Sequence, residues 1–139
     1  MTKKGNATNW YIDYSGTTGS DFFGNLKLEN QQQLLDILNL SVPEFFAEYT
    51  LYRDDWLYPY LHLVRAGEYW YVHYFPSQQE PGYFALDEVV KSRGTTFFPT
   101  ATYFKMDNRN LVTTEVALQV AREFYETGEK PSCCDWFEL

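Results

Sequence analysis

Residues 59–75, PYLHLVRAGEYWYVHYF, contain two runs of alternating apolar side chains separated by a short segment around a glycine. Runs of period two are typical of strands, and a two-residue loop with glycine in first place is typical of a tight hairpin turn. If Gly67 and Glu68 form that loop, the register of the whole hairpin follows. The predicted pairs are Leu63–Val72, Leu61–Tyr74, Arg65–Trp70, Val64–Tyr71, His62–His73 and Tyr60–Phe75.

This register gives the predicted hairpin two apolar faces. Successive side chains of a strand point to opposite sides, so one face carries mostly aliphatic and aromatic groups that suit packing against helices. The other face carries aromatic rings and the two imidazoles of His62 and His73. A sheet that is apolar on both sides needs cover on both, from helices, loops or another chain. The second face is therefore where a partner protein or a second copy of the chain could bind.

Further strands are predicted on both sides of this hairpin. Residues 95–105 should divide into two edge strands, because Pro99 lacks the N–H that a central ladder requires. Residues 53–56 are predicted as a loop, and residues 1–8 are polar and expected to be flexible. The complete set of regular strand patterns covers residues 9–14, 46–52, 59–65, 69–75 and 82–86.

Two segments have helical patterns. Asn30 followed by Gln33 matches a capping box and predicts a short helix that runs to about Leu40. A second helix is predicted from Thr114, with Thr113 as its N-cap. The 139 residues suit a single domain. We therefore predict an α+β fold over residues 1–139, with a central, mostly antiparallel sheet, an N-terminal helix and a long C-terminal helix.

The last 27 residues, TTEVALQVAREFYETGEKPSCCDWFEL, give the clearest local signals. An apolar stripe at helical spacing predicts a face that docks on the sheet. Gly128 is suited to the left-handed residue that ends a helix, and Pro131 prevents the helix from continuing. A strand-like run then leads to Trp136. The apolar stripe consists of Val116, Val120 and Phe124.

This C-terminal segment resembles the end of a bacterial immunity protein family of polymorphic toxin systems, whose members protect the producing cell from deaminase toxins. The likeness spans residues 31–139 and is sharpest at the C-terminus. Most of the matching residues occupy packing and turn positions. They are Pro59, Leu61, Tyr71, Val72, Tyr74, Gly82, Tyr83, Ala117, Phe124, Thr127, Gly128, Pro131 and Trp136.

The resemblance implies a stoichiometric inhibitor that binds a cognate toxin. The implied toxin is a nucleobase deaminase, and the implied mechanism is that the inhibitor covers the active-site entrance. A nuclease toxin is an alternative partner with the same mechanism. A small-ligand-binding α+β domain is a different alternative, which would require a deep pocket around His62 and His73.

Charge and composition are compatible with a protein partner. The formal net charge of −8 argues against direct nucleic-acid binding, which depends on lysine and arginine contacts to phosphate. An acidic surface suits a basic protein, although moderate acidity also serves solubility alone. Aromatic residues make up 19% of the chain, which fits a β-rich core together with a contact surface.

Two loops are predicted to contact the partner. Interfaces favour Trp and Tyr anchors surrounded by polar groups, and both segments fit that description in part. The alternative for the aromatic residues is that they pack back onto the sheet. The first candidate segment contributes Asp54, Asp55, Trp56 and Tyr58, and the second contributes Gln79 and Glu80.

The sequence offers little for catalysis. His62 and His73 could supply two metal ligands, but a catalytic zinc site needs a third protein ligand, for which only Glu48 or Glu80 are candidates. Half-buried, hydrogen-bonded imidazoles without a metal are therefore predicted. Phosphate-binding loops and nucleophile-elbow motifs are missing from the sequence. We predict a protein without enzymatic activity and without a cofactor.

The remaining features concern the compartment. The adjacent Cys133 and Cys134 could form a bridge only in a strained geometry, so two free thiols are predicted. They lack CxxC or CxxH companions, which argues against a zinc site. The sequence has neither an apolar run long enough to span a membrane nor the apolar core of a secretory signal. A cytoplasmic protein is therefore expected.

Overall fold

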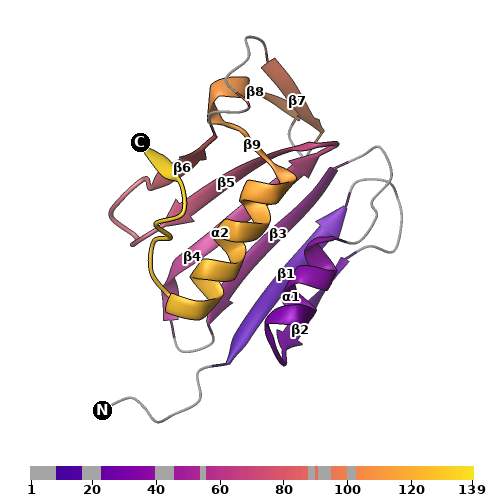
Figure 1. Cartoon of the computed structure of the whole chain (residues 1–139), viewed down its shortest axis with the longest axis vertical. Coiled ribbons are helices and arrows are strands. Elements are labelled where there is room, and N and C mark those ends of the chain that lie inside the picture. The colour runs from indigo at the N-terminus through magenta and orange to yellow at the C-terminus, as the bar shows by residue number, and fades with distance from the viewer. Residues whose placement is uncertain are drawn as a thin grey trace.

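The computed structural model describes residues 9–16, 23–39, 46–53, 56–87, 90, 95–99 and 103–139. Among these, eight strands form one sheet in the order β10-β6-β5-β4-β3-β1-β2, with β9 paired to β5 (Figure 1). Two further strands form a separate small sheet. The strands are β1 (Trp10–Gly16), β2 (Phe23–Leu28), β3 (Phe46–Arg53), β4 (Trp56–Ala66), β5 (Tyr69–Phe75), β6 (Tyr83–Leu86), β7 (Thr95–Pro99), β8 (Tyr103–Asp107), β9 (Val112–Thr113) and β10 (Asp135–Glu138).

The fold is α+β, and each ladder among the described strands is antiparallel. The prediction of an N-terminal helix and a long C-terminal helix is wrong. Helix α1 (Gln31–Leu38) follows β1 and β2, because the alternating residues before it pair as a hairpin beside β3. Helix α2 (Thr114–Thr127) has 14 residues, close to the usual helix length. It is followed by β10, which pairs with β6.

The helix ends follow the predicted capping signals. The Asn30 side chain accepts a hydrogen bond of 2.9 Å from the backbone N–H of Gln33, which fixes the start of α1. Thr113 caps α2 in the same way. Gly128 adopts a left-handed φ of 71° and donates its N–H to the Phe124 carbonyl over 2.7 Å. A Cβ at Gly128 would lie 2.5 Å from Arg53 Nη1, but this is the end of a flexible side chain, so the positive φ is what requires glycine here.

The register of the β4–β5 hairpin is the predicted one. All six predicted pairs occur, from Tyr60 opposite Phe75 to Arg65 opposite Trp70. Ala66 pairs with Tyr69, which leaves Gly67 and Glu68 as the loop residues. Gly67 has a φ of 65°, a conformation that only glycine adopts readily. One turn residue therefore determines which side chains share each face of the two central strands.

The main core lies between the two helices and one face of the sheet. Trp70 is fully buried, and its indole N–H donates a 2.9 Å hydrogen bond to Thr114 Oγ1 at the start of α2. At the other end of α2, the ring of Phe124 meets the edge of the Trp10 ring at 5.3 Å. Truncation of an aromatic side chain in such a core costs about 3–5 kcal/mol. These contacts fix α2 along the sheet from both ends.

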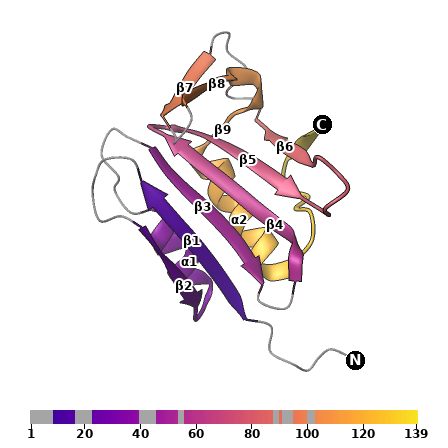
Figure 2. The same cartoon turned by 180° about the vertical axis from the view of Figure 1, so that it is seen from behind.

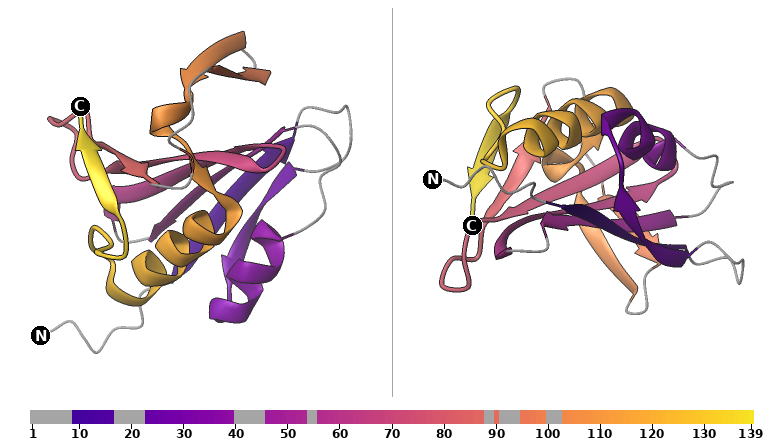
Figure 3. Two further views of the ribbon diagram at one scale, coloured as in Figure 1. Left: turned by 45° about the horizontal axis from the view of Figure 1, so that its top comes forward. Right: turned by 90° about the horizontal axis from the view of Figure 1, so that it is seen from below.

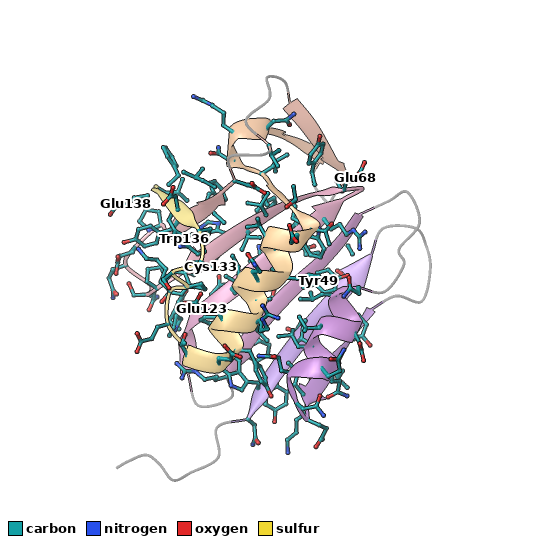
Figure 4. All side chains as sticks on the ribbon, in the orientation of Figure 1. Tyr49, Glu68, Glu123, Cys133, Trp136 and Glu138 are labelled. Atoms are coloured by element: carbon teal, nitrogen blue, oxygen red, sulfur yellow. The ribbon has the colours of Figure 1, made fainter. Side chains whose placement is uncertain are left out.

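The segment after α2 returns to the sheet edge. Glu123 accepts hydrogen bonds from the backbone N–H and the hydroxyl of Ser132, and Trp136 donates its indole N–H to the Pro131 carbonyl over 2.8 Å. Figure 4 places Glu123, Cys133 and Trp136 together on this side of the molecule. Trp136 lies opposite Ala85 of β6 and packs against the main core. The predicted strand-like run is thus a strand at the sheet edge.

Residues 95–105 divide into two strands, as the proline predicted. β7 ends at Pro99 and pairs with β8 as a small sheet separate from the main one. Figure 3 shows this hairpin extending to the side of the main sheet opposite the helices. Within the described residues, neither helix has the length and apolar character needed to cross a membrane. The expectation for residues 1–8 lies outside the described residues.

Candidate functional site

Both helices cover the same face of the main sheet. In Figure 2, which views the molecule from behind, the strands β1, β3, β4 and β5 lie in front of α1 and α2. Figure 3 shows the two helices together on one side of the sheet. We call the opposite side the open face. Its central side chains are Tyr11 and Asp13 of β1, Glu48, Thr50 and Tyr52 of β3, Tyr58, Tyr60 and His62 of β4, and His73 and Phe75 of β5.

One part of the open face is covered. Val64 is fully buried, and with Val90 and Leu111 it forms a second, smaller apolar cluster. Ala66 and Tyr71 pack against this cluster, and burial raises the pKa of the Tyr71 hydroxyl to about 12. This cover lies at the end of the sheet near the β4–β5 turn. The cluster therefore supplies part of the second cover that the sequence predicted, and the remaining area is exposed or half-buried.

Stacked aromatic rings occupy the remaining area of β4, β5 and β6. The Tyr60 and Phe75 rings stack at 4.5 Å, and His73 stacks on Phe75 at 3.7 Å. Phe84 meets the edge of His73 at 4.7 Å. Such contacts hold the rings in a fixed arrangement and leave their outer surface free for a further apolar group. Pre-ordered aromatic side chains lose little conformational freedom on binding.

Polar groups border these rings on β1, β2 and β3. The Asp13 carboxylate accepts hydrogen bonds from the Asn25 amide and, over 3.1 Å, from the Tyr52 hydroxyl, both on Oδ1. The Asn25 amide also donates to the Tyr52 hydroxyl over 2.8 Å. On the neighbouring strands, His62 Nε2 lies 3.0 Å from Glu48 Oε1. The two carboxylates thus stand on adjacent strands, each oriented by a neighbour.

A shallow groove of about 390 Å³ lies between the aromatic and acidic parts. It is open to solvent along the sheet surface. A second hollow of about 180 Å³ continues from it past Thr50 to Ser15 and Glu48. We call the larger hollow the tyrosine groove. It is lined by Asp13, Thr50, Tyr52, Tyr58, Tyr60 and His62.

Hydrogen bonding and burial set the charge of this surface. The hydrogen bond from His62 holds the pKa of Glu48 below its ordinary value, so this carboxylate stays charged at neutral pH. Burial raises the pKa of Tyr52 and of Tyr60, so both hydroxyls stay neutral. Burial also lowers the pKa of His73, which favours its neutral form. The surface is therefore anionic near Glu48 and uncharged among the rings.

The two histidines pair across β4 and β5 but have different partners. His62 is hydrogen-bonded to Glu48, whereas His73 Nε2 donates to the Pro81 carbonyl over 2.8 Å. Glu48 is thus adjacent to one imidazole, as the sequence allowed. Within the described residues, no group of three or more His, Cys, Asp or Glu side chains is arranged to hold a metal ion. Both imidazoles are half-buried and hydrogen-bonded, as predicted.

The first predicted contact loop is in part a strand. Asp54 and Asp55 lie outside the described residues. Trp56 is the first residue of β4 and pairs with Arg53, so the prediction of a loop over residues 53–56 is wrong there. The register between β3 and β4 shifts near this point, and such a bulge accommodates a residue like Pro59 that cannot donate to a ladder. The Trp56 side chain is not among the described parts of the structure.

Tyr58 is the residue of that segment that the structure brings to the site. Its ring lies 5.3 Å from the Tyr60 ring and lines the tyrosine groove. Packing onto the sheet and exposure to a partner were predicted as alternatives. The Tyr58 side chain packs onto the sheet and stays partly exposed, and its contact with a partner stays a prediction.

Gln79 and Glu80 lie in the connection between β5 and β6 and are exposed. The Ser77 hydroxyl donates a 3.1 Å hydrogen bond to Glu80, so this turn is ordered by its own side chains. In an antiparallel sheet the end of β5 lies at the same end as the start of β4. Gln79 and Glu80 are therefore near the Tyr58 end of the open face but outside the tyrosine groove.

Sequence reasoning missed Asp13, Thr50, Tyr52 and the role of Tyr60 at the groove. A signal for them was present, because residues 9–14 and 46–52 have the period-two pattern of strands. Every second residue of such a segment can be assigned to the same face of the sheet. Their meeting depends on β1 lying beside β3, with Asp13 opposite Thr50. The sequence between β1 and β3 does not specify that these two strands pair.

The two cysteines are free thiols, as predicted; Cys133 is exposed and Cys134 is half-buried. Burial raises the pKa of Cys134 to about 12 and also raises that of Cys133, so neither is activated as a nucleophile.

Comparison with protein family models found no match, and comparison with curated proteins found no similar sequence. The resemblance to the immunity family therefore rests on the residues quoted for it.

Proposed function

We propose that this protein is an inhibitor that neutralises a cognate bacterial toxin by binding it through the open face. The observation that carries the proposal is that both helices cover one side of a sheet whose other side presents ordered, stacked aromatic rings. Exposed aromatic patches bordered by polar groups are typical of protein-binding surfaces. Asp13, Glu48, Tyr58 and Tyr60 would be the central contacts, with Gln79 and Glu80 at the border.

The resemblance noted in the sequence supplies the type of partner. The toxin would be a nucleobase deaminase, which works on a base extruded into a narrow pocket. A protein that covers the entrance to this pocket is sufficient to stop the reaction, without chemistry of its own. The net charge of −8 would favour encounter with the basic surface that such a toxin uses for nucleic acid. The inhibitor would act in the cytoplasm of the producing cell.

The small-ligand alternative receives less support from the geometry. The tyrosine groove has a volume of about 390 Å³, within the range of small-molecule sites. Such sites enclose most of the ligand surface, whereas this groove is open along the sheet. His73 is hydrogen-bonded to a backbone carbonyl and is not part of the lining. The small-ligand alternative would require a deep pocket around both histidines, whereas the tyrosine groove is open and includes only His62 of the two.

The test is protection from a toxin encoded next to the gene for this chain. The candidate toxin is expressed from an inducible promoter in a bacterial host, with and without the inhibitor, and survival is measured. Purified proteins are then titrated by calorimetry. We expect survival only with the inhibitor and a complex of one to one stoichiometry. Unchanged killing together with no heat of binding would refute the proposal.

Variants locate the binding surface. Tyr60→Ala removes a half-exposed ring from the centre of the open face and should weaken the complex at least tenfold, as is usual for an aromatic anchor. Arg122→Ala, at an exposed position of α2, is the control and should leave the affinity unchanged. Circular dichroism and urea unfolding of both variants verify that they fold. Equal effects of the two substitutions would place the interface elsewhere.

A further inference from the structure

The tyrosine groove combines aromatic walls with the Asp13 carboxylate, and the smaller hollow that continues from it reaches the Glu48 carboxylate on the adjacent strand. Asp13 lies opposite Thr50, and Ser15 lies opposite Glu48, so the two acidic side chains are diagonal neighbours on adjacent strands, with Thr50 beside both. Adjacent strands are about 4.8 Å apart, and alternate residues of one strand about 7 Å apart. A single extended side chain that enters the groove can therefore reach both carboxylates.

Neither carboxylate is neutralised by a cation of the described chain. Among the described residues, the only ion pair involving Asp13 or Glu48 is the contact between Glu48 and His62. The hydrogen bonds that the described residues donate to Asp13 all end on Oδ1, which leaves Oδ2 for an external donor. On the open face of β1 to β5, Lys27 of the edge strand β2 is the only described lysine or arginine. The groove therefore attracts a cation.

The walls of the groove favour a flat cation. Tyr52, Tyr58 and Tyr60 contribute ring surface, and the Tyr58 and Tyr60 rings are tilted by 40° at 5.3 Å. A guanidinium stacks on aromatic faces and donates two parallel hydrogen bonds to a carboxylate, whereas a lysine ammonium is a strongly hydrated point charge. The carboxylates repel phosphate and other anions.

The same pairing of arginine with aromatic rings occurs within the chain, on the helix-covered face of the sheet. The Arg53 guanidinium lies 5.4 Å from the centre of the Trp10 ring, and the Arg65 guanidinium lies 5.3 Å from that of Trp70. We infer that the tyrosine groove is a receptor for an arginine side chain of the protein partner. Its guanidinium would lie against the tyrosine rings and donate to Asp13 and Glu48.

The chemistry indicates which arginine this is. Toxins that act on nucleic acid use arginine side chains to contact phosphate oxygens. A carboxylate accepts the same pair of hydrogen bonds as a phosphate. Asp13 and Glu48 would therefore bind an arginine of the toxin that otherwise contacts the phosphate backbone of its nucleic-acid substrate. The groove meets such an arginine only if the protein binds a toxin, so this assignment rests on the proposed function.

The test uses a capped tripeptide, acetyl-Gly-Arg-Gly-amide, and the full chain labelled with nitrogen-15. The control peptide carries citrulline, which keeps the shape of arginine and lacks its charge. Titration is followed by the backbone amide signals. We expect saturable shifts at Thr50, Tyr52 and Tyr60 with the arginine peptide, and at least tenfold weaker binding of the citrulline peptide. Equal binding of the two peptides, or shifts confined to other residues, would overturn the inference.

Charge-neutralised variants connect the groove to the toxin. The double variant Asp13→Asn, Glu48→Gln should weaken both the arginine peptide and the toxin by at least tenfold. Glu115→Gln, which removes an exposed carboxylate from the first turn of α2, is the matched control and should change neither. A toxin that binds the double variant as tightly as the wild type would refute the arginine groove while the inhibitor function stands. Peptide binding without any toxin binding would refute the inhibitor function and leave the groove chemistry intact.

Discussion

Gly82 precedes β6 and is the glycine whose replacement we expect to damage the site most. Its φ is 98°, which side chains with a Cβ rarely adopt. A Cβ built there lies 2.4 Å from the Tyr74 carbonyl oxygen and 2.8 Å from His73 Nε2. The first of these atoms belongs to the backbone of a central strand and cannot move without disturbing the ladder. The second is the atom that donates to the Pro81 carbonyl.

The expected cost of Gly82→Ala has three contributions. The backbone conformation costs about 1–3 kcal/mol for a residue with a Cβ. The lost hydrogen bond between His73 and Pro81 adds about 0.5–1.5 kcal/mol. Displacement of the Tyr74 backbone adds strain, so we expect a loss of roughly 2–5 kcal/mol in the free energy of unfolding, which is large for a single substitution.

Gly67→Ala is the matched control. Gly67 also has a positive φ, of 65°, but a Cβ built there has no other atom within 4 Å. It therefore reports the conformational cost alone, about 1–2 kcal/mol. Urea unfolding of both variants gives the midpoints, and equal slopes verify that the extent of unfolding is unchanged. If Gly82→Ala is no more destabilising than Gly67→Ala, the close approach at Tyr74 and His73 is not what requires the glycine.

Three further substitutions test the local chemistry. Thr113→Ala removes the α2 cap and the 3.0 Å hydrogen bond to Asp87, so urea unfolding should show a loss of about 1–2 kcal/mol that Thr113→Ser largely restores. Glu48→Gln should destabilise the protein near neutral pH. Because the folded state lowers the pKa of Glu48, its contribution is present above the ordinary value of 4.5 and is lost as pH falls through the lowered pKa, where the variant and wild type should converge. His73→Phe should retain the ring stacking and flatten the pH profile. Burial lowers the pKa of His73 below 6.5, so the wild type alone should lose stability as pH falls below that value; parallel profiles would contradict this cause.

The parts of the fold that were predictable from sequence depend on local signals. The turn at Gly67 fixed every pair of the β4–β5 hairpin, and the caps Asn30 and Thr113 fixed the starts of the helices. Each of these signals acts within a few residues of the chain. They can therefore be recognised in the sequence without knowing which strands and helices pack together.

The site itself was only partly predictable, because it depends on contacts between distant segments. Tyr52 and Asp13 are 39 residues apart and meet only because β1 lies beside β3. The prediction of a loop over residues 53–56 assumes that a strand starts at Pro59, whereas a register shift admits the proline within β4. The two helices were predicted at opposite ends of the chain. That prediction did not say whether they would cover the same side of the sheet. The sequence singles out Tyr58 and places Tyr60 and His62 on the second face of the hairpin, whereas Asp13, Thr50 and Tyr52 were missed.

An aromatic face that the described residues cover only in part favours contact between copies of the chain as well as with a partner, and charge distinguishes the two. Asp13 and Glu48 on the open face, together with the net charge of −8, oppose the approach of a second copy and would favour the basic toxin that we propose as partner. Salt screens both effects beyond about 8 Å at physiological ionic strength. Rising salt should therefore slow association with the toxin and, in the absence of toxin, increase self-association. Surface plasmon resonance measures the first effect and light scattering the second. Self-association that decreases with salt would mean that copies attract one another through charge, and the acidic open face could not then account for selection of the partner.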